Sequence, residues 1–198
     1  MKVTAIQPKI PHEEPAMVKR HDPFDTDQAL LEGCCRNDRN AQEQFYRKYH
    51  GGMLALCLRY TRNRSTALDI MNRGFLRVFS KINEYRPTGS LTAWIKVIMV
   101  HAIADYFREH NKLPVQYTGL APKDETLFVE PDKEFTKELL QKALEQLTDT
   151  QRLVFNLFAI EGYPHREIAA LCRMNENTVR WVYAEAKKKL KQILTHLL

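Results

Sequence analysis

The chain has 198 residues, of which 44% are hydrophobic and 27% are charged, with a net charge of +6. This composition excludes a disordered chain, and the length predicts one domain or two small ones. The four cysteines are expected to be buried, reduced thiols, and no Cys/His cluster has the spacing of a metal site. The apolar run 91–104 is too short to span a bilayer, and the first residues lack a signal-peptide core, so a cytoplasmic protein without membrane insertion is expected.

Residues 1–25 hold four prolines and little periodic pattern, and they are predicted to be a flexible tail. Beyond them, apolar residues three and four apart predict a first helix opening at Asp27 and capped by Thr26 or Asp25. A second helix is predicted after a cap at Asn40, and a third beginning at Thr66. The segment 86–90 is predicted to be a loop, and 91–111 one long helix.

Residues 113–135 hold three prolines, with five acidic and two basic side chains, a composition typical of a linker. After it, the pattern predicts helices near 136–146, 149–160, 164–173 and 176–197. No alternating strand pattern is present in the sequence. The prediction is therefore an all-α fold of two small helical domains, 26–112 and 136–198, joined by an acidic linker.

The two predicted domains carry the basic charge. Residues 26–112 contain 14 basic and 8 acidic side chains, and residues 136–198 contain 10 and 7. A basic surface suits a polyanion such as nucleic acid, although an ordinary solvated surface accounts equally well for the total.

Residues 161–179 have the pattern of a helix-turn-helix motif. Gly162 suits the end of one helix, Pro164 the first turn of the next, and Asn175 the cap of a further helix. The second helix of such a motif normally lies in the major groove of DNA. A plain helical hairpin is the alternative, but the turn residues and the basic run 187–191 favour DNA binding.

Residues 147–155 followed by this motif resemble region 4 of the extracytoplasmic-function sigma factors, the smallest sigma subunits of bacterial RNA polymerase. The stretches 67–79, 89–95 and 104–108 resemble their region 2. The resemblance implies an alternative sigma factor that directs promoter-specific transcription initiation. An enzyme is a rival interpretation, but the sequence has no GxxxxGK loop, HExxH motif, nucleophile elbow or metal cluster, so neither catalysis nor a metal or cofactor is expected. A stand-alone helix-turn-helix regulator is the alternative function, and an anti-sigma or adaptor protein imitating sigma surfaces is a third.

The resemblance also implies the contact residues. Those for the clamp helices of the polymerase β′ subunit are Asp69, Asn72, Arg73 and Arg77. Those for the minus-10 promoter element, which is melted and read as a flipped base on a single strand, are Arg86, Thr88, Gly89, Ser90, Thr92, Lys96 and Arg108. Those for the duplex minus-35 element, read by region 4 while it meets the polymerase β flap, are Arg166, Asn177, Thr178, Arg180, Trp181, Lys187 and Lys188.

Region 2 departs from the family pattern at two adjacent positions. Arg73 stands where an acidic residue is usual, and Gly74 follows it inside the helix, where glycine costs about 1 kcal/mol relative to alanine. The apolar residues of the same helix, Met71, Phe75 and Val78, are expected in the core, and Trp94 is expected in the core rather than as a stacking platform. In the family the linker lies near the RNA exit path, and a simple tether is the alternative.

Region 4 departs further. Val182 and Glu185 stand at two usual arginine positions, Arg173 replaces the turn glycine, and Trp181 is expected to be exposed. These substitutions predict a weak or unusual contact with the minus-35 element, for which there are two explanations. Either a recruiting protein bound at region 4 or at the tail supplies part of the targeting, or the minus-35 sequence is divergent and is read by apolar contact. An anti-sigma factor or a recruiting protein is accordingly a further expected partner.

Overall fold

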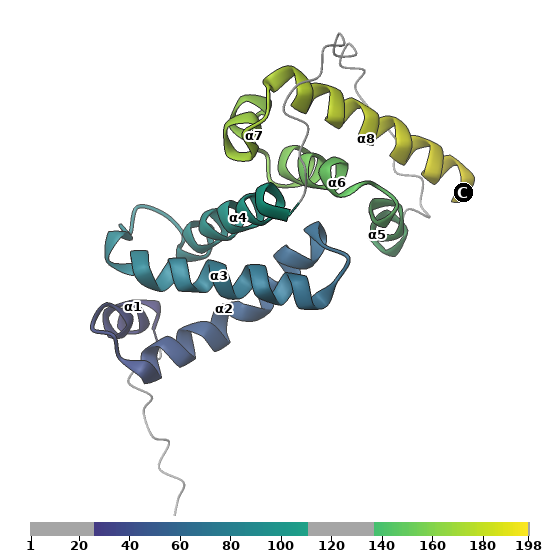
Figure 1. Ribbon diagram of the computed structural model, residues 1–198. Coiled ribbons are helices and arrows are strands. Elements are labelled where there is room, and N and C mark those ends of the chain that lie inside the picture. Colours follow the sequence, from purple (N-terminus) through teal and green to yellow (C-terminus); the bar gives the residue numbers. More distant parts are fainter. Residues whose placement is uncertain (1–25, 111–136, 198) are drawn as a thin grey trace, which may run out of the picture.

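The computed structural model describes residues 26–110 and 137–197, and every regular element in these ranges is a helix (Figure 1). The N-terminal bundle consists of α1 (Asp27–Cys35), α2 (Arg39–Tyr60), α3 (Arg64–Lys81), the 3-10 turn η1 (Ile82–Glu84) and α4 (Leu91–His110). The C-terminal bundle consists of α5 (Lys137–Glu145), α6 (Asp149–Phe155), the π-helical segment η2 (Asn156–Ile160), α7 (His165–Cys172) and α8 (Glu176–Leu197). The all-α prediction is confirmed.

The predicted tail 1–25 and the predicted linker 113–135 lie outside the described residues. Within the described ranges, no helix combines the length and the apolar character that crossing a bilayer requires.

Side-chain caps decide where the helices begin. Thr26 Oγ1 accepts the N–H of Ala29 at 3.1 Å, as predicted for α1. Helix α2 begins two residues earlier in the chain than predicted. Its N-cap is Asp38 rather than Asn40, and the Asp38 carboxylate accepts the N–H of Asn40 at 2.8 Å. Asn37, at φ 58°, turns the chain just before this cap. Such a turn frees the short acidic side chain to satisfy the first N–H groups of the helix.

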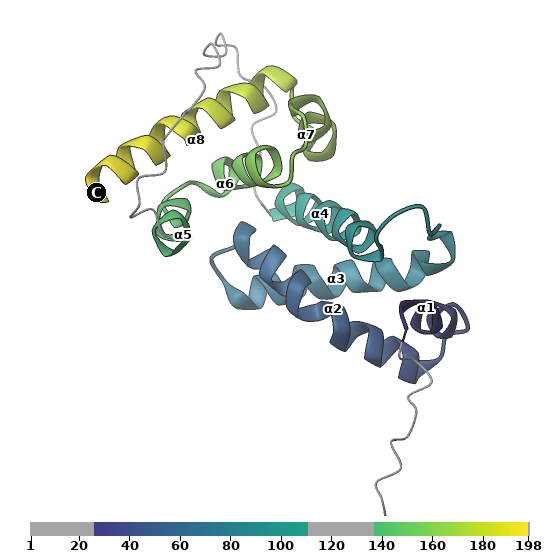
Figure 2. The same cartoon turned by 180° about the vertical axis from the view of Figure 1, so that it is seen from behind.

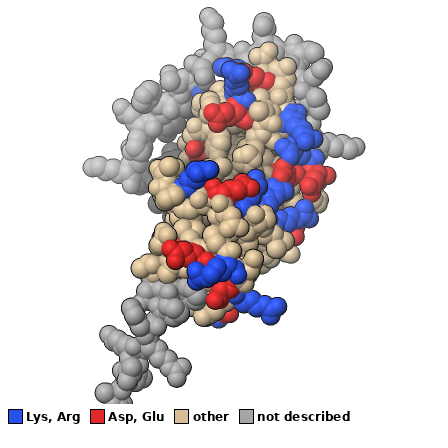
Figure 3. Space-filling view, turned by 90° about the vertical axis from the view of Figure 1, so that its left-hand side faces the viewer, with Lys and Arg blue, Asp and Glu red and all other residues tan. Residues whose placement is uncertain are grey.

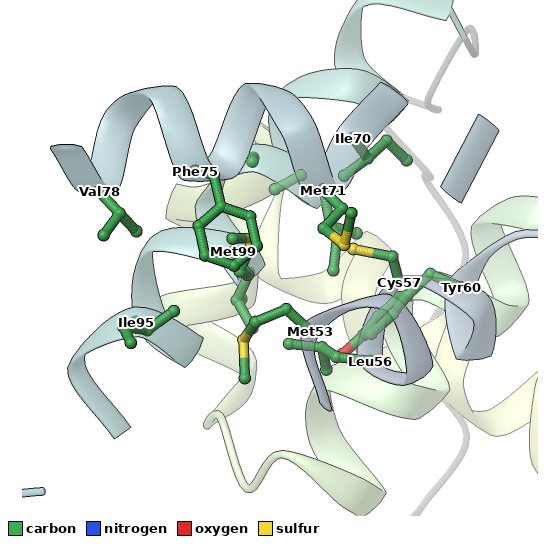
Figure 4. Packing of buried hydrophobic residues seen from close by; sticks show 14 of the residues in the cluster. Met53, Leu56, Cys57, Tyr60, Ile70, Met71, Phe75, Val78, Ile95 and Met99 are labelled. Carbon is green, nitrogen blue, oxygen red and sulfur yellow. The ribbon is translucent and has the colours of Figure 1, made fainter. Parts of the chain in front are cut away.

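The core of the N-terminal bundle lies where α2, α3 and α4 meet (Figure 4). Met71, Phe75 and Val78 of α3 are each at most 2% exposed, so their predicted core position is confirmed. Side chains of α2 and α4 complete the cluster, among them Met53 and Ile95. Burying a side chain of this size contributes about 1.5–3 kcal/mol, so this stripe stabilises the packing of α3 in the bundle.

Gly74 lies where α3 crosses α4. A Cβ atom at this position would lie 2.2 Å from Sδ of Met99, a side chain that is itself fully buried. The absence of a side chain at Gly74 therefore lets the two helices approach closely around Met99. Glycine at position 74 lowers the intrinsic stability of the helix, but close packing against Met99 explains why this residue departs from the family pattern.

The C-terminal bundle contains a buried arginine that closes helix α5. Arg152 is 1% exposed, and its Nε donates to the carbonyl of Leu144 at 3.0 Å while Nη2 donates to that of Leu147 at 3.1 Å. The last carbonyls of a helix lack partners in the helix itself and lie at the negative end of its dipole. Arg152 thus satisfies the end of α5 and joins it to α6.

The two bundles pack directly on each other. Helix α4 contacts α7 and α2 contacts α6, and one hydrophobic cluster continues from the N-terminal bundle to Leu153 and Ile168. Figures 1 and 2 show α4 between α3 and the C-terminal bundle from both sides. The described parts of the chain thus form a closed arrangement.

The cysteines are all free thiols, three of them buried. The expectation that all four are buried is wrong for Cys35, which is exposed at the end of the short helix α1. Burial raises the pKa of the Cys34 thiol to about 11 and those of Cys57 and Cys172 to about 12.

Replacing Gly74 with alanine tests the crossing. The gain of about 1 kcal/mol in helix propensity is outweighed by overpacking against Met99, which costs about 1–3 kcal/mol. Denaturant unfolding should show a net loss of stability for Gly74→Ala. Met99→Ala should cost less in the Gly74→Ala background than in the wild type, because the new methyl group fills part of the cavity. Additive losses in this double-mutant cycle would contradict the close contact.

The difference in burial among the four cysteines predicts which thiols react with a modifying reagent in the native protein. The thiolate is the reactive form, so a raised pKa keeps a thiol protonated and slow to react until the pH approaches that pKa. With Ellman's reagent at pH 8, one thiol should react quickly and three only after unfolding in guanidinium. Cys35→Ser should remove the fast phase and leave the other three unchanged. Two or more fast thiols in the native wild type would refute this assignment.

Candidate nucleic-acid interface

The helix-turn-helix forms as predicted from residues 161–179. Gly162 takes a positive φ of 78° after η2, and Pro164 is the N-cap of α7. Arg173, the residue in the usual glycine position, adopts the left-handed conformation at φ 54°. Asn175 then accepts the N–H of Asn177 at 2.8 Å and so caps α8. The motif's turn is therefore built without its glycine, at a conformation that side chains rarely adopt.

Four of the residues assigned to the minus-35 element face solvent: Arg166, Asn177, Arg180 and Lys188. The guanidinium of Arg180 lies 2.7 Å from the Glu176 carboxylate one turn earlier, which holds it along the exposed face of α8. Lys187 is half-buried, with its ammonium 5.4 Å from the ring centre of Tyr183.

Two other assigned residues on α8 are placed differently. Thr178 is fully buried beside Val179, so in this conformation it supports packing rather than presenting a group to solvent. The expectation of an exposed Trp181 is wrong: the indole is half-buried and packs against the hydrophobic cluster. Its large ring reaches the cluster from a position off the main buried stripe. Position 182 is also inside, because Val182 is 2% exposed. Of the two departures from arginine, only Glu185 is therefore partly exposed to solvent.

The segment 86–90 is the predicted loop, and it is exposed throughout, as is Thr92 on the first turn of α4. Tyr85 holds the loop, since its hydroxyl donates to the carbonyl of Gly89 at 2.9 Å. The Tyr85 ring lies 5.3 Å from that of Trp94, which is half-buried against the core. The loop residues assigned to the minus-10 element, Arg86, Thr88, Gly89 and Ser90, are thus presented together on a fixed base.

The remaining two residues of that set contact the C-terminal bundle. Lys96 Nζ lies 2.5 Å from Oε2 of Glu161, and Arg108 Nη1 donates to the carbonyl of Leu171 at 2.5 Å. Both acceptors belong to the C-terminal bundle. Arg108 also pairs with Asp105 of its own helix. The structure therefore separates Lys96 and Arg108 from the exposed loop residues.

One face of α3 presents most of the residues assigned to polymerase. Asp69, Asn72 and Arg73 are exposed, and Arg73 pairs with Asp69 at 3.1 Å and with Glu109 of α4 at 3.0 Å. Arg77 is half-buried and bound to Asp105. Sequence reasoning missed Leu76, which is 70% exposed on the same face. Leu76 follows Arg73 by three residues and Asn72 by four, so the sequence places it on the same helix face as these polar residues and away from the buried stripe.

Figure 3 shows acidic and basic side chains interspersed on the face that it presents. Several arginines of the described residues are paired with carboxylates, among them Arg73, Arg77 and Arg180. Across 26–110 and 137–197, no group of three or more His, Cys, Asp or Glu side chains is arranged to hold a metal ion.

Comparison with known proteins gives matches to two family models. Residues 45–113 match sigma-70 region 2, and residues 137–190 match sigma-70 region 4. Among curated relatives, the RNA polymerase sigma factor SigV of Bacillus subtilis is 27% identical over 86% of this chain and 94% of its own length. The ECF RNA polymerase sigma factor SigM of Mycobacterium tuberculosis is 26% identical over 90% of this chain and 88% of its own.

Solved structures that match this chain include the sigma factor RpoE in complex with the anti-sigma factor NepR from Bartonella quintana, with a TM-score of 0.47 at 16% identity. That match covers 77% of this chain and 96% of the other. CnrH in complex with the cytosolic domain of CnrY matches with a TM-score of 0.45 at 17% identity, over 86% of this chain and 97% of the other.

The bond between Tyr85 and Gly89 can be tested without a ligand. Tyr85→Phe removes one hydrogen bond, worth about 1 kcal/mol, and keeps the ring contact with Trp94. Exchange of the Thr88 amide, which donates to the carbonyl of Arg86 at 2.7 Å, should become up to about fivefold faster, while exchange in the interior of α3 stays unchanged. Unchanged exchange in the loop would mean that the hydroxyl does not hold it.

Proposed function

The chain belongs to the sigma-70 family as an extracytoplasmic-function RNA polymerase sigma factor. On this basis, we propose which of its surfaces bind polymerase and promoter DNA during transcription initiation. An alternative sigma factor binds core RNA polymerase and promoter DNA. The observation that carries the function is that both sigma-70 regions occur in one chain, in the family's order. A stand-alone helix-turn-helix regulator has no need of region 2.

The proposal assigns a separate role to each of four segments of the chain. Residues 26–112 act as region 2, 113–135 as the linker, 136–198 as region 4, and 1–25 as a tail before them. The proposal assigns binding roles alone, without catalysis, and places the protein in the cytoplasm, where polymerase and DNA meet.

The α3 face is proposed to bind the clamp helices of the β′ subunit. Asn72 and Arg73 offer polar groups around the apolar side chain of Leu76, and this arrangement suits a helix-on-helix contact. Asp69 lies at one end of the face and contributes through its pair with Arg73. Arg77 is proposed to act at the margin, because Asp105 already engages it.

The exposed loop 86–90 is proposed to read the melted minus-10 strand. Thr88 and Ser90 offer hydroxyl groups to a flipped base, and Arg86 offers a cation to the phosphates beside it. Thr92 extends this surface onto α4. Lys96 and Arg108 complete the set once they are released from the C-terminal bundle.

The minus-35 duplex is proposed to meet α7 and the first turns of α8. Arg166, Asn177 and Arg180 are exposed where the recognition helix of this motif approaches base edges, and Lys187 and Lys188 lie further along α8, suited to phosphates. Because Trp181 packs on the hydrophobic cluster, its indole is withdrawn both from a recruiting partner and from apolar contact with DNA, so the exposed polar residues are proposed to read the duplex.

Transcription in vitro tests the function. Purified bacterial core polymerase with this protein should give discrete new RNA starts on sheared genomic DNA of the source organism. Core polymerase alone is the control. Binding to core without discrete starts would show that targeting needs a recruiting partner. No binding to core would overturn the assignment.

Leu76→Ala tests the polymerase face. Apolar anchors at the centre of an interface typically contribute about 2 kcal/mol or more, so affinity for core polymerase should fall at least about tenfold. Leu58→Ala, which truncates a leucine of α2 that is 37% exposed, is the matched control and should bind as the wild type does. Equal affinities for the two variants would place the polymerase contact elsewhere.

A further inference from the structure

Glu161 connects the two bundles through a buried carboxylate. Its side chain is 1% exposed, with Oε1 at 2.5 Å from Nη2 of Arg59 on α2 and Oε2 at 2.5 Å from Nζ of Lys96 on α4. A carboxylate withdrawn from water is stable only where cations replace its hydration. Oε1 accepts a hydrogen bond from Arg59, whereas Oε2 is paired with Lys96 by charge alone and has no hydrogen-bond partner. Both cations come from the other bundle, so the charge of Glu161 is paired in this way only while the bundles are in contact.

Two helix ends repeat this arrangement. Arg62 donates to the carbonyl of Leu147, just beyond α5, and Arg108 donates to that of Leu171 in the last turn of α7, both at 2.5 Å. Such carbonyls lie at the negative end of the helix dipole. In each of these contacts the cation belongs to the N-terminal bundle and the negative group to the C-terminal bundle. Asn156 adds a neutral bond, donating to the carbonyl of Arg59 at 2.9 Å.

Lys96 and Arg108 are also residues proposed to hold the melted strand. The Lys96 side chain is 43% exposed, but its positive charge is paired with the buried carboxylate of Glu161, and this pairing weakens its attraction for a phosphate. The α3 face, by contrast, remains open, since Asn72, Arg73 and Leu76 are exposed. The closed arrangement therefore weakens two strand contacts and leaves the polymerase contact accessible.

The distance between the promoter elements points the same way. Elements named for positions 10 and 35 lie about 25 base pairs apart, roughly 85 Å of DNA at 3.4 Å per base pair. Helix α4, which follows the minus-10 loop, here contacts α7 of the helix-turn-helix directly. Bundles in direct contact do not reach both elements of a straight duplex.

We propose that this closed arrangement is an autoinhibited state, in which Glu161 occupies Lys96 as an intramolecular substitute for a DNA phosphate. The inference rests on the proposed function for the roles of Lys96 and Arg108. Breaking the Glu161 contacts removes one of several links between the bundles and so shifts the protein toward an open arrangement, in which Lys96 and Arg108 are free to contact the strand.

Glu161→Gln in the full chain tests the proposal, because the amide keeps the shape and removes the charge. Glu167→Gln is the matched control, since it neutralises another carboxylate lining the same cleft between α4 and α7. Small-angle scattering should give a larger radius of gyration for Glu161→Gln and an unchanged one for Glu167→Gln. Equal radii for both variants and the wild type would overturn the latch.

Binding of a fluorescein-labelled 20-nucleotide oligo(dT) measures the consequence. Glu161→Gln should bind at least about fivefold tighter than the wild type, and Glu167→Gln within about twofold. Adding Lys96→Gln should remove most of this gain, because the freed ammonium is what the strand meets. Equal gains for Glu161→Gln and Glu167→Gln would mean that only net charge acts, and would overturn the proposal.

Two further measurements keep the outcomes separate. If Glu161→Gln fails to fold by circular dichroism, Arg62→Gln at the exposed surface takes its place and should give a smaller opening in the same direction. A compact Arg62→Gln protein with wild-type strand affinity would overturn the latch. Core polymerase binding is measured alongside. Its absence in every variant defeats the proposed function, whereas scattering still decides whether Glu161 closes the bundles.

Discussion

Helix α4 is buried on more than one side, and the arrangement of both bundles depends on this. Ala102, Ile103 and Ala104 are consecutive, and each is at most 2% exposed, which a helix with a single apolar face cannot achieve. Helices α2 and α3 cover part of its surface, and α7 covers another part. One helix therefore belongs to the core of region 2 and also supports the helix-turn-helix, so the position of α4 couples the two.

The local features of this chain were predictable because their causes are local. Periodic apolar residues indicated the helices, and Met71, Phe75 and Val78 lie in the core as their spacing indicates. Caps and turns depend on neighbours a few residues away, and the errors there, as at Asp38, are shifts of one or two positions. Gly74 shows the limit: its sequence context reveals a propensity cost, whereas its reason is Met99 on another helix.

The candidate site was only partly predictable, because a resemblance names positions without their exposure. Thr178 and Val182 are inside and Trp181 is half inside, although they share a helix with exposed Arg180. The engagement of Arg59 by Glu161, 102 residues away, depends on how two helical units meet, and neither residue carries a local signal of it. The same holds for charge: total basicity suggested a polyanion partner, while intramolecular pairs occupy several of the arginines.

The π-helical segment η2 determines the direction in which the residues directly after α6 point. Its wider turn is closed by the N–H of Glu161 donating to the carbonyl of Asn156 at 2.9 Å, five residues back. A π turn holds roughly one residue more than an α turn, and each helical residue rotates the chain by about 100°. The extra residue thus works as an angular spacer that directs Glu161 toward Arg59 and Lys96. A chain that lost one residue here and continued as a regular α-helix would keep every charge and point the carboxylate elsewhere.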